Sequence, residues 1–98
     1  MPNLLVIGAS NSTTSINRTF AAWAAAQVPG ASATVLDLND FEMPLYSPER
    51  EAATGVPEPA KRFVAAIEGA DALVVSLAEH NGSYSAAFKN VFDWGTRH

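Results

Sequence analysis

Hydroxyl and amide side chains gather directly after the first apolar run of the chain. Residues 8–17 read GASNSTTSIN, with five hydroxyls, two amides and no charged residue. Such donors stabilise a phosphate when they stand at a helix N-terminus, where free backbone N–H groups add to them. A P-loop would need Gly-Lys-Ser/Thr at its end, and a dinucleotide-binding fingerprint would need three spaced glycines. Gly8 stands alone, so neither motif is present. We therefore expect a phosphate site without a lysine; the alternative is that Ser15 only caps a helix.

A second polar segment, residues 78–85, reads AEHNGSYS. Its ring, amide and backbone donors could border a planar heterocycle. The alternatives are an exposed loop histidine for His80 and simple surface charge for Glu79, which we do not propose as a general base. No second His or carboxylate stands at metal-ligand spacing, so we expect no metal and name no catalytic residue.

Apolar runs alternate with helical patterns along the chain. Continuous apolar runs at 4–7 and 72–77 are typical of covered parallel strands, and the partial alternation at 33–38 predicts an edge strand. Helical spacing starts near Ile16 and ends at Pro29-Gly30, and a second helix runs from Pro57 to Gly69. Residues 39–57 read as a long surface loop. A third helix near the end carries a predicted core stripe of Phe88, Phe92 and Trp94.

This βαβαβα order predicts an α/β fold of the flavodoxin-like type, a three-layer α/β/α arrangement around a parallel sheet of strand order 2-1-3. Ligands bind such sheets at the carboxyl ends of the strands, at the switch point between strands one and three. An apolar third strand is costly at a sheet edge. We therefore expect the sheet to lack its C-terminal strands, so that the 1–98 domain is incomplete.

Composition narrows the function classes. The chain has 98 residues, a formal net charge of −4 and no basic run, which argues against a nucleic-acid surface and favours small-molecule partners. It has no Cys, so any redox chemistry must come from a bound cofactor. The first residues are too short an apolar run for a signal peptide or membrane span, and we expect a cytoplasmic protein.

Two strings carry a resemblance to a known family. The first is GAS followed by SINR at 8–18, and the second is EHNGS at 79–83 followed by FKNVFDW at 88–94. Together they resemble the NADPH-dependent FMN reductase family, which includes flavin, azo, chromate and quinone reductases. Members are usually nearly twice as long, so the chain corresponds to an N-terminal half. The family often has Arg at the position of Ser12 and Pro and Tyr at those of Ala78 and His80.

The resemblance implies a flavin site and an activity. FMN would be the cofactor and NAD(P)H the co-substrate, with electrons passing to a quinone, azo compound, metal oxyanion or free flavin, and a homo-oligomer would form. The implied phosphate-side residues are Ser10, Ser12, Ser15, Ile16 and Asn17, and the implied ring-side residues are Glu79, His80, Asn81 and Ser83. The alternatives are a flavodoxin-like electron carrier, a non-catalytic fragment of the reductase, and, least favoured, a Rossmann protein with Asp37 on a ribose.

Overall fold

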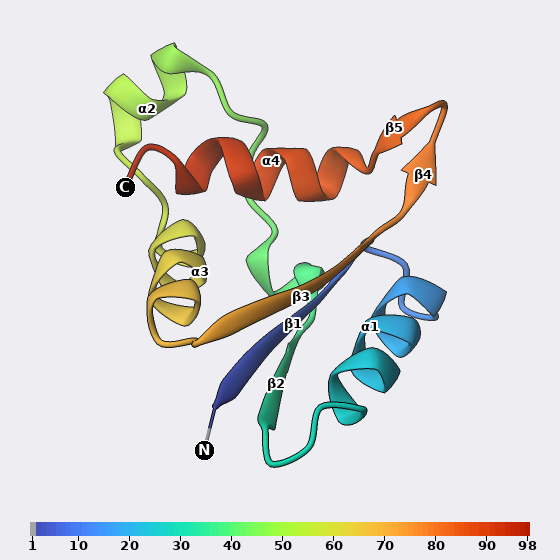
Figure 1. Ribbon diagram of the computed structural model, residues 1–98. Coiled ribbons are helices and arrows are strands. Elements are labelled where there is room, and N and C mark those ends of the chain that lie inside the picture. Colours follow the sequence, from blue (N-terminus) through green and yellow to red (C-terminus); the bar gives the residue numbers. More distant parts are fainter. Residues whose placement is uncertain (1) are drawn as a thin grey trace.

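Strand β1 (Asn3–Ala9) lies at the centre of the sheet in the computed structural model, which describes residues 2–98 (Figure 1). It pairs in parallel with β2 (Ser32–Leu36) on one side and with β3 (Ala72–Leu77) on the other. The order β2-β1-β3 confirms the predicted 2-1-3 topology and the flavodoxin-like fold class.

Helices cover both faces of this sheet. Helix α1 packs on one face, whereas α3 and α4 lie on the other, so that the molecule has the expected three layers (Figure 1). The remaining elements are α1 (Ile16–Ala26), the 3-10 helix η1 (Leu38–Phe41), α2 (Pro48–Thr54), α3 (Glu58–Glu68), the short antiparallel strands β4 (Glu79–His80) and β5 (Ser83–Tyr84), and α4 (Ala86–Gly95).

The core divides along the pleat of β1. Leu5 and Ile7 face one cluster, and Leu4 and Val6 face the other, because successive side chains point to opposite faces of a strand. The first cluster is completed by Leu38, Phe41, Phe63 and Val91, and the second by Ala21 and Ala25. Burial on both faces is the physical reason why this strand is a continuous apolar run.

The segment at 39–57 differs from its prediction as a loop. It holds the end of η1 and the helix α2. Ser47 caps α2, Pro48 occupies its first turn, and Gly55 ends it with a φ of 74°. None of the residues of α2 is buried, so the helix has no apolar periodicity by which the sequence could reveal it.

Two apolar stripes face solvent. On α1 the core is reached by Ala21 and Ala25, while Ile16, Phe20 and Trp23 remain 80%, 59% and 59% exposed. On α4 the prediction of a core stripe is wrong for Phe92, which is 52% exposed; the fully buried residues there are Val91 and Trp94. Helical spacing identifies an apolar face but does not decide which neighbour covers it.

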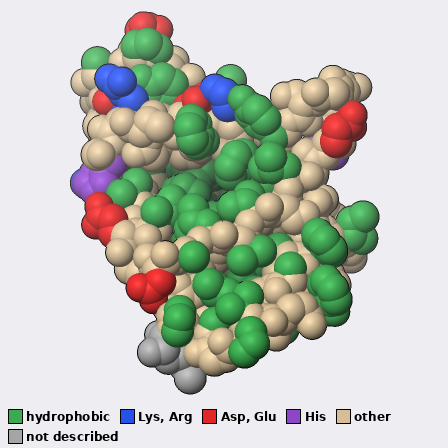
Figure 2. Space-filling view, in the orientation of Figure 1, with side chains coloured by type: hydrophobic (Ala, Val, Ile, Leu, Met, Phe, Trp, Pro, Cys, Tyr) green, Lys and Arg blue, Asp and Glu red, His purple; other side chains and the backbone are tan. Residues whose placement is uncertain are grey.

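The outer edge of the sheet is also apolar. Within residues 2–98, β3 has no partner strand on its outer side, and Leu73, Val75 and Leu77 are each between 41% and 52% exposed. Their register partners Leu5 and Ile7 place them on the α3–α4 face. Figure 2 shows hydrophobic side chains across this part of the molecule. The structure therefore contains the exposed apolar edge strand that is expected to be energetically unfavourable.

Candidate functional site

The two polar loops predicted to hold a ligand begin at neighbouring strand ends. Ala9 at the end of β1 pairs with Leu77 at the end of β3. The Ser85 hydroxyl, which is buried, donates to the Ala9 carbonyl at 2.8 Å and accepts from the Phe88 N–H at 3.2 Å. This single side chain caps α4 and joins it to β1. Residues 8–17 and 78–85 therefore start from one edge of the sheet, at the switch point.

Serine side chains shape the first loop from within. Ser10 Oγ accepts from the Ser12 N–H at 3.1 Å, and Ser12 Oγ accepts from the Thr14 N–H at 3.3 Å. Ser15 is buried and caps α1, since its Oγ accepts from the Arg18 N–H at 3.1 Å. The interpretation of Ser15 as a helix cap is thus confirmed. The other hydroxyls hold successive turns of the loop and remain at the surface or partly so.

The first turn of α1 offers backbone donors to an anion. Within residues 2–98, the N–H groups of Ile16 and Asn17 donate to no protein atom, as expected for the start of a helix. No acidic residue stands in this turn. Ile16 has an exposed side chain, so any contact with a phosphate would use its backbone. This donor set suits a phosphate in both charge and hydrogen-bonding capacity.

A close contact beneath the loop fixes where α1 starts. A Cβ built on Gly8 would lie 2.2 Å from Arg18 Cα, so only glycine permits this approach. The Arg18 guanidinium then donates to the Thr13 carbonyl at 3.3 Å and pairs with Asp37 at 3.2 Å. It places a positive charge beside the loop, a role that the sequence did not reveal.

Asp37 belongs to this support rather than to a ribose site. The backbone N–H of Asn39, together with its side chain and Arg18, holds the pKa of Asp37 below its usual range, although burial acts in the opposite direction. The same carboxylate caps η1. Its contacts agree with its interpretation as a strand-end residue.

Asn17 links α1 to β3. Its Oδ1 accepts from the Ser76 hydroxyl at 2.7 Å. The amide is thereby oriented, and its Nδ2 makes no hydrogen bond within the described part of the chain. Asn17 therefore keeps a donor available at the loop while its oxygen serves the packing of the helix on the sheet.

The second loop is a tight hairpin. Asn81 and Gly82 both have positive φ, 53° and 82°, as a two-residue type I′ turn requires. The Glu79 carboxylate accepts from the Gly82 N–H at 3.0 Å, so it stabilises its own turn. Glu79, His80, Asn81 and Ser83 are all exposed. Glu79 and Ser83 line an open depression of about 380 Å³, whereas His80 and Asn81 do not.

Two residues of α4 hold the segment 42–46, which we call the strap. Asn90 donates to the carbonyls of Met43 and Pro44 at 3.1 and 3.2 Å and accepts from the Tyr46 N–H at 2.9 Å. Trp94 donates to the Pro44 carbonyl at 2.8 Å and is fully buried. Trp94 thus has the core packing role that the helical spacing predicts for it. The role of Asn90 was missed, although its place in the KNVFDW string was the available signal.

Among residues 2–98, no cluster of three or more His, Asp or Glu side chains could hold a metal ion. No helix in the same range is long and apolar enough to cross a membrane.

Comparison with known proteins places this geometry in context. The model of a family described as NADPH-dependent FMN reductase matches residues 2–98. A probable NADPH:quinone oxidoreductase 2 from rice, Oryza sativa subsp. japonica, is 33% identical over 70 residues, which are 71% of this chain and 34% of that protein. An uncharacterized protein of Mycoplasma pneumoniae is 33% identical over 93 residues, 95% of this chain and 54% of its own length.

A solved structure has the same arrangement. FerB, a flavoenzyme NAD(P)H:(acceptor) oxidoreductase from Paracoccus denitrificans, superposes with a TM-score of 0.77 at 27% identity. The match covers all of this chain and 52% of the FerB chain. The chain therefore spans between about a third and about half of the length of these relatives.

Proposed function

Because the chain belongs to the NADPH-dependent FMN reductase family, we propose that it binds FMN at the carboxyl ends of β1 and β3 and takes part in NAD(P)H-dependent oxidoreduction. The observation that carries the proposal is the junction of the two polar loops at the paired ends Ala9 and Leu77, tied together by Ser85. This is the switch point at which open α/β sheets bind ligands.

The first loop would hold the FMN phosphate. Ser10, Ser12 and Ser15 frame the loop, and the N–H groups of Ile16 and Asn17 would donate to the phosphate oxygens. Arg18 lies below the loop at its contact with Thr13 and would compensate part of the phosphate charge. Because its guanidinium is also paired with Asp37, Arg18 would replace only in part the arginine that the family often has at the position of Ser12.

The hairpin would border the flavin ring. The depression lined by Glu79 and Ser83 is the surface on which the ring would lie, and we place His80 and Asn81 at its rim. Bound FMN supplies hydride acceptance from NAD(P)H and electron delivery to an acceptor. The chain itself would position the ring and donate backbone and side-chain hydrogen bonds to it, with no protein acid or base required.

The acceptor and the assembly are also proposals. We propose a small-molecule acceptor of the quinone, azo, metal-oxyanion or free-flavin type and a cytoplasmic location. Two relatives support a small-molecule acceptor, since the rice protein is a probable NADPH:quinone oxidoreductase and FerB is an NAD(P)H:(acceptor) oxidoreductase. The exposed apolar rows on β3 and α1 favour a homo-oligomer, which size-exclusion chromatography with light scattering would test.

Flavin binding is the first experiment. FMN fluorescence quenching is titrated with the chain and with Ser15→Ala and Ser12→Glu. The matched control is Ser47→Ala, because Ser47 caps α2 through the same 3.1 Å contact, to Arg50, that Ser15 makes to Arg18. We expect saturable binding that Ser47→Ala leaves unchanged. Each loop variant should weaken it at least about tenfold, because Ser15→Ala removes one hydrogen bond to the charged phosphate and Ser12→Glu adds a carboxylate that repels it.

Two outcomes would overturn the proposal. Absence of FMN binding by the unaltered chain would mean that these residues alone do not form the site. Equal weakening by Ser15→Ala and Ser47→Ala would trace the effect to helix capping rather than to the phosphate. If FMN binds, the next assay follows oxidation of NAD(P)H by the absorbance of the reduced nicotinamide at about 340 nm. This assay separates a reductase from an electron carrier, since a carrier alone oxidises almost no NAD(P)H.

A further inference from the structure

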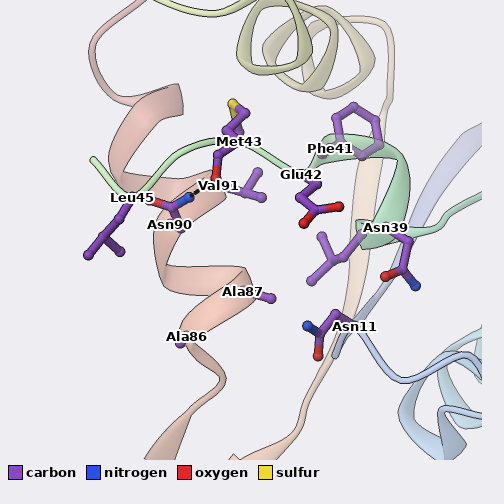
Figure 3. A pocket seen from close by; sticks show the side chains of 11 residues that line it. Asn11, Asn39, Phe41, Glu42, Met43, Leu45, Ala86, Ala87, Asn90 and Val91 are labelled. Atoms are coloured by element: carbon purple, nitrogen blue, oxygen red, sulfur yellow. Dashed lines mark hydrogen bonds between the residues drawn. The ribbon is translucent and has the colours of Figure 1, made fainter. Parts of the chain in front are cut away.

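A second hollow of the molecule lies outside the predicted flavin residues. It has a volume of about 280 Å³, is open to solvent on one side, and is bounded by three separate segments: Asn11 from the first loop, the region from η1 into the strap, and the first half of α4. Figure 3 shows Asn11, Glu42 and Ala87 pointing toward it from these three elements. None of the nine residues predicted from the sequence lines it.

The walls of this pocket are apolar and held in place. Leu38, Phe41 and Val91 are buried members of the main core cluster, and Met43 packs against that cluster. The strap side is fixed because Asn90 uses its amide on the carbonyls of Met43 and Pro44. The space is therefore a pre-formed slot with apolar sides, of the kind that takes a flat ring.

The polar groups of the pocket are mainly hydrogen-bond acceptors. The Glu42 carboxylate has no ion pair or hydrogen bond within residues 2–98. Asn39 uses one N–H of its Nδ2 on Asp37 at 3.0 Å, which leaves its Oδ1 as an acceptor and its second N–H as a donor. The Asn11 amide can likewise donate and accept, so the Glu42 carboxylate is the group that requires a donor on the ligand. A ligand that matches this set must carry donors.

We propose that the pocket binds a flat one- or two-ring compound that carries N–H or O–H donors directed at Glu42 and Asn39. Its volume of about 280 Å³ lies just below the usual range for small-molecule sites, so the pocket takes only a small ligand. Two sources share this chemistry: the purine of the nicotinamide dinucleotide, and a phenolic or amino-aromatic product of acceptor reduction. The choice between sources rests on the proposed function, whereas binding of the ring itself does not.

Amide chemical shifts of the ¹⁵N-labelled chain provide the test. The probes are adenosine and resorcinol, each paired with an analogue whose ring system carries no N–H or O–H donor, N6,N6-dimethyladenosine and 1,3-dimethoxybenzene. We expect saturable shifts at Asn11, Asn39 and Glu42 with at least one donor-bearing probe. Binding of adenosine alone supports the dinucleotide source, resorcinol alone supports the acceptor source, and binding of both supports the shared chemistry.

Variants make the assignment specific. Glu42→Gln is expected to weaken binding about 5- to 10-fold, because a charged acceptor is replaced by a neutral one in a partly exposed site. Ala86→Leu narrows the slot at an exposed helical position and should abolish the shifts. Glu49→Gln removes an equal charge from α2, outside the pocket, and should change nothing.

Three results would overturn the proposal: equal binding of the analogues without donors, an effect of Glu42→Gln no larger than that of Glu49→Gln, or no shift with either probe. FMN is titrated separately on the same sample. Ring binding without FMN binding would reject the proposed function and leave the pocket assigned, and the reverse result would reject the pocket alone.

Discussion

Asn90 is the residue whose replacement most directly tests how the strap is held. Its side chain makes three hydrogen bonds across 44 to 47 residues of sequence, to the carbonyls of Met43 and Pro44 and to the N–H of Tyr46. Asn90→Ala removes all three and leaves the backbone of α4 unchanged. Because Asn90 is half-buried, the released strap groups can reach water only in part.

The expected loss follows from these contacts. Three hydrogen bonds at about 1 kcal/mol each give about 3 kcal/mol. Partial rehydration of the strap and the better helix propensity of alanine, which is about 0.6 kcal/mol, offset some of this. We predict that Asn90→Ala lowers the free energy of unfolding by about 2 kcal/mol. For a domain of this size that corresponds to a fall in Tm of about 8–16 °C.

Urea unfolding followed by circular dichroism measures the effect, with the m-value checked for constancy. The control is Lys89→Ala, which removes the exposed ion pair with Asp93 on the same helix and should cost no more than about 0.5 kcal/mol. Trp94→Phe removes the indole bond to Pro44 and also shortens a fully buried side chain that packs against Tyr46, so it should cost more than Lys89→Ala. If Asn90→Ala is as stable as Lys89→Ala, the amide does not hold the strap and the reasoning fails.

Three further predictions concern the junction of the two loops. Gly8→Ala should destabilise the chain by about 3 kcal/mol or more, because its Cβ would collide with Arg18 Cα; a change below 1 kcal/mol in urea unfolding would contradict the close packing. Ser85→Ala should cost about 2–3 kcal/mol by removing a helix cap and leaving the Ala9 carbonyl unpaired, measured as a lower Tm. The pKa of Asp37 is lowered in the folded chain. Its contribution to folding stability is therefore complete above the ordinary pKa of 3.8 and is lost as the pH falls through the lower pKa of the folded chain. The contribution stays below about 1 kcal/mol because the group is largely solvated, and the stability difference between the chain and Asp37→Asn should shrink only below pH 3.8.

The sequence by itself determined the architecture of this protein. A parallel strand covered on both faces must be apolar at every position, so β1 was visible as a continuous apolar run. The run of β3 was visible as well, although one of its faces is exposed, and the alternation of strands with helices allowed few topologies. The hydroxyl-rich loop and the Asn-Gly turn are local features, since each depends on residues within a few positions of one another. The predicted site residues therefore fell at one sheet edge, as expected.

Tertiary structure alone decided the contacts between distant segments. The partner of Asn90 lies more than 40 residues away, and a single asparagine on a helix carries no sign of whether it faces water or a backbone carbonyl. The same holds for Arg18 with Asp37, and for the pocket that joins Asn11 to Glu42. Helix α2 was not predicted because it buries no side chain. The large apolar residues of α1 are exposed because the contact at Gly8 brings the opposite face of the helix, lined by alanines, onto the sheet. Periodicity records that a face is apolar, whereas only packing selects the surface that covers it.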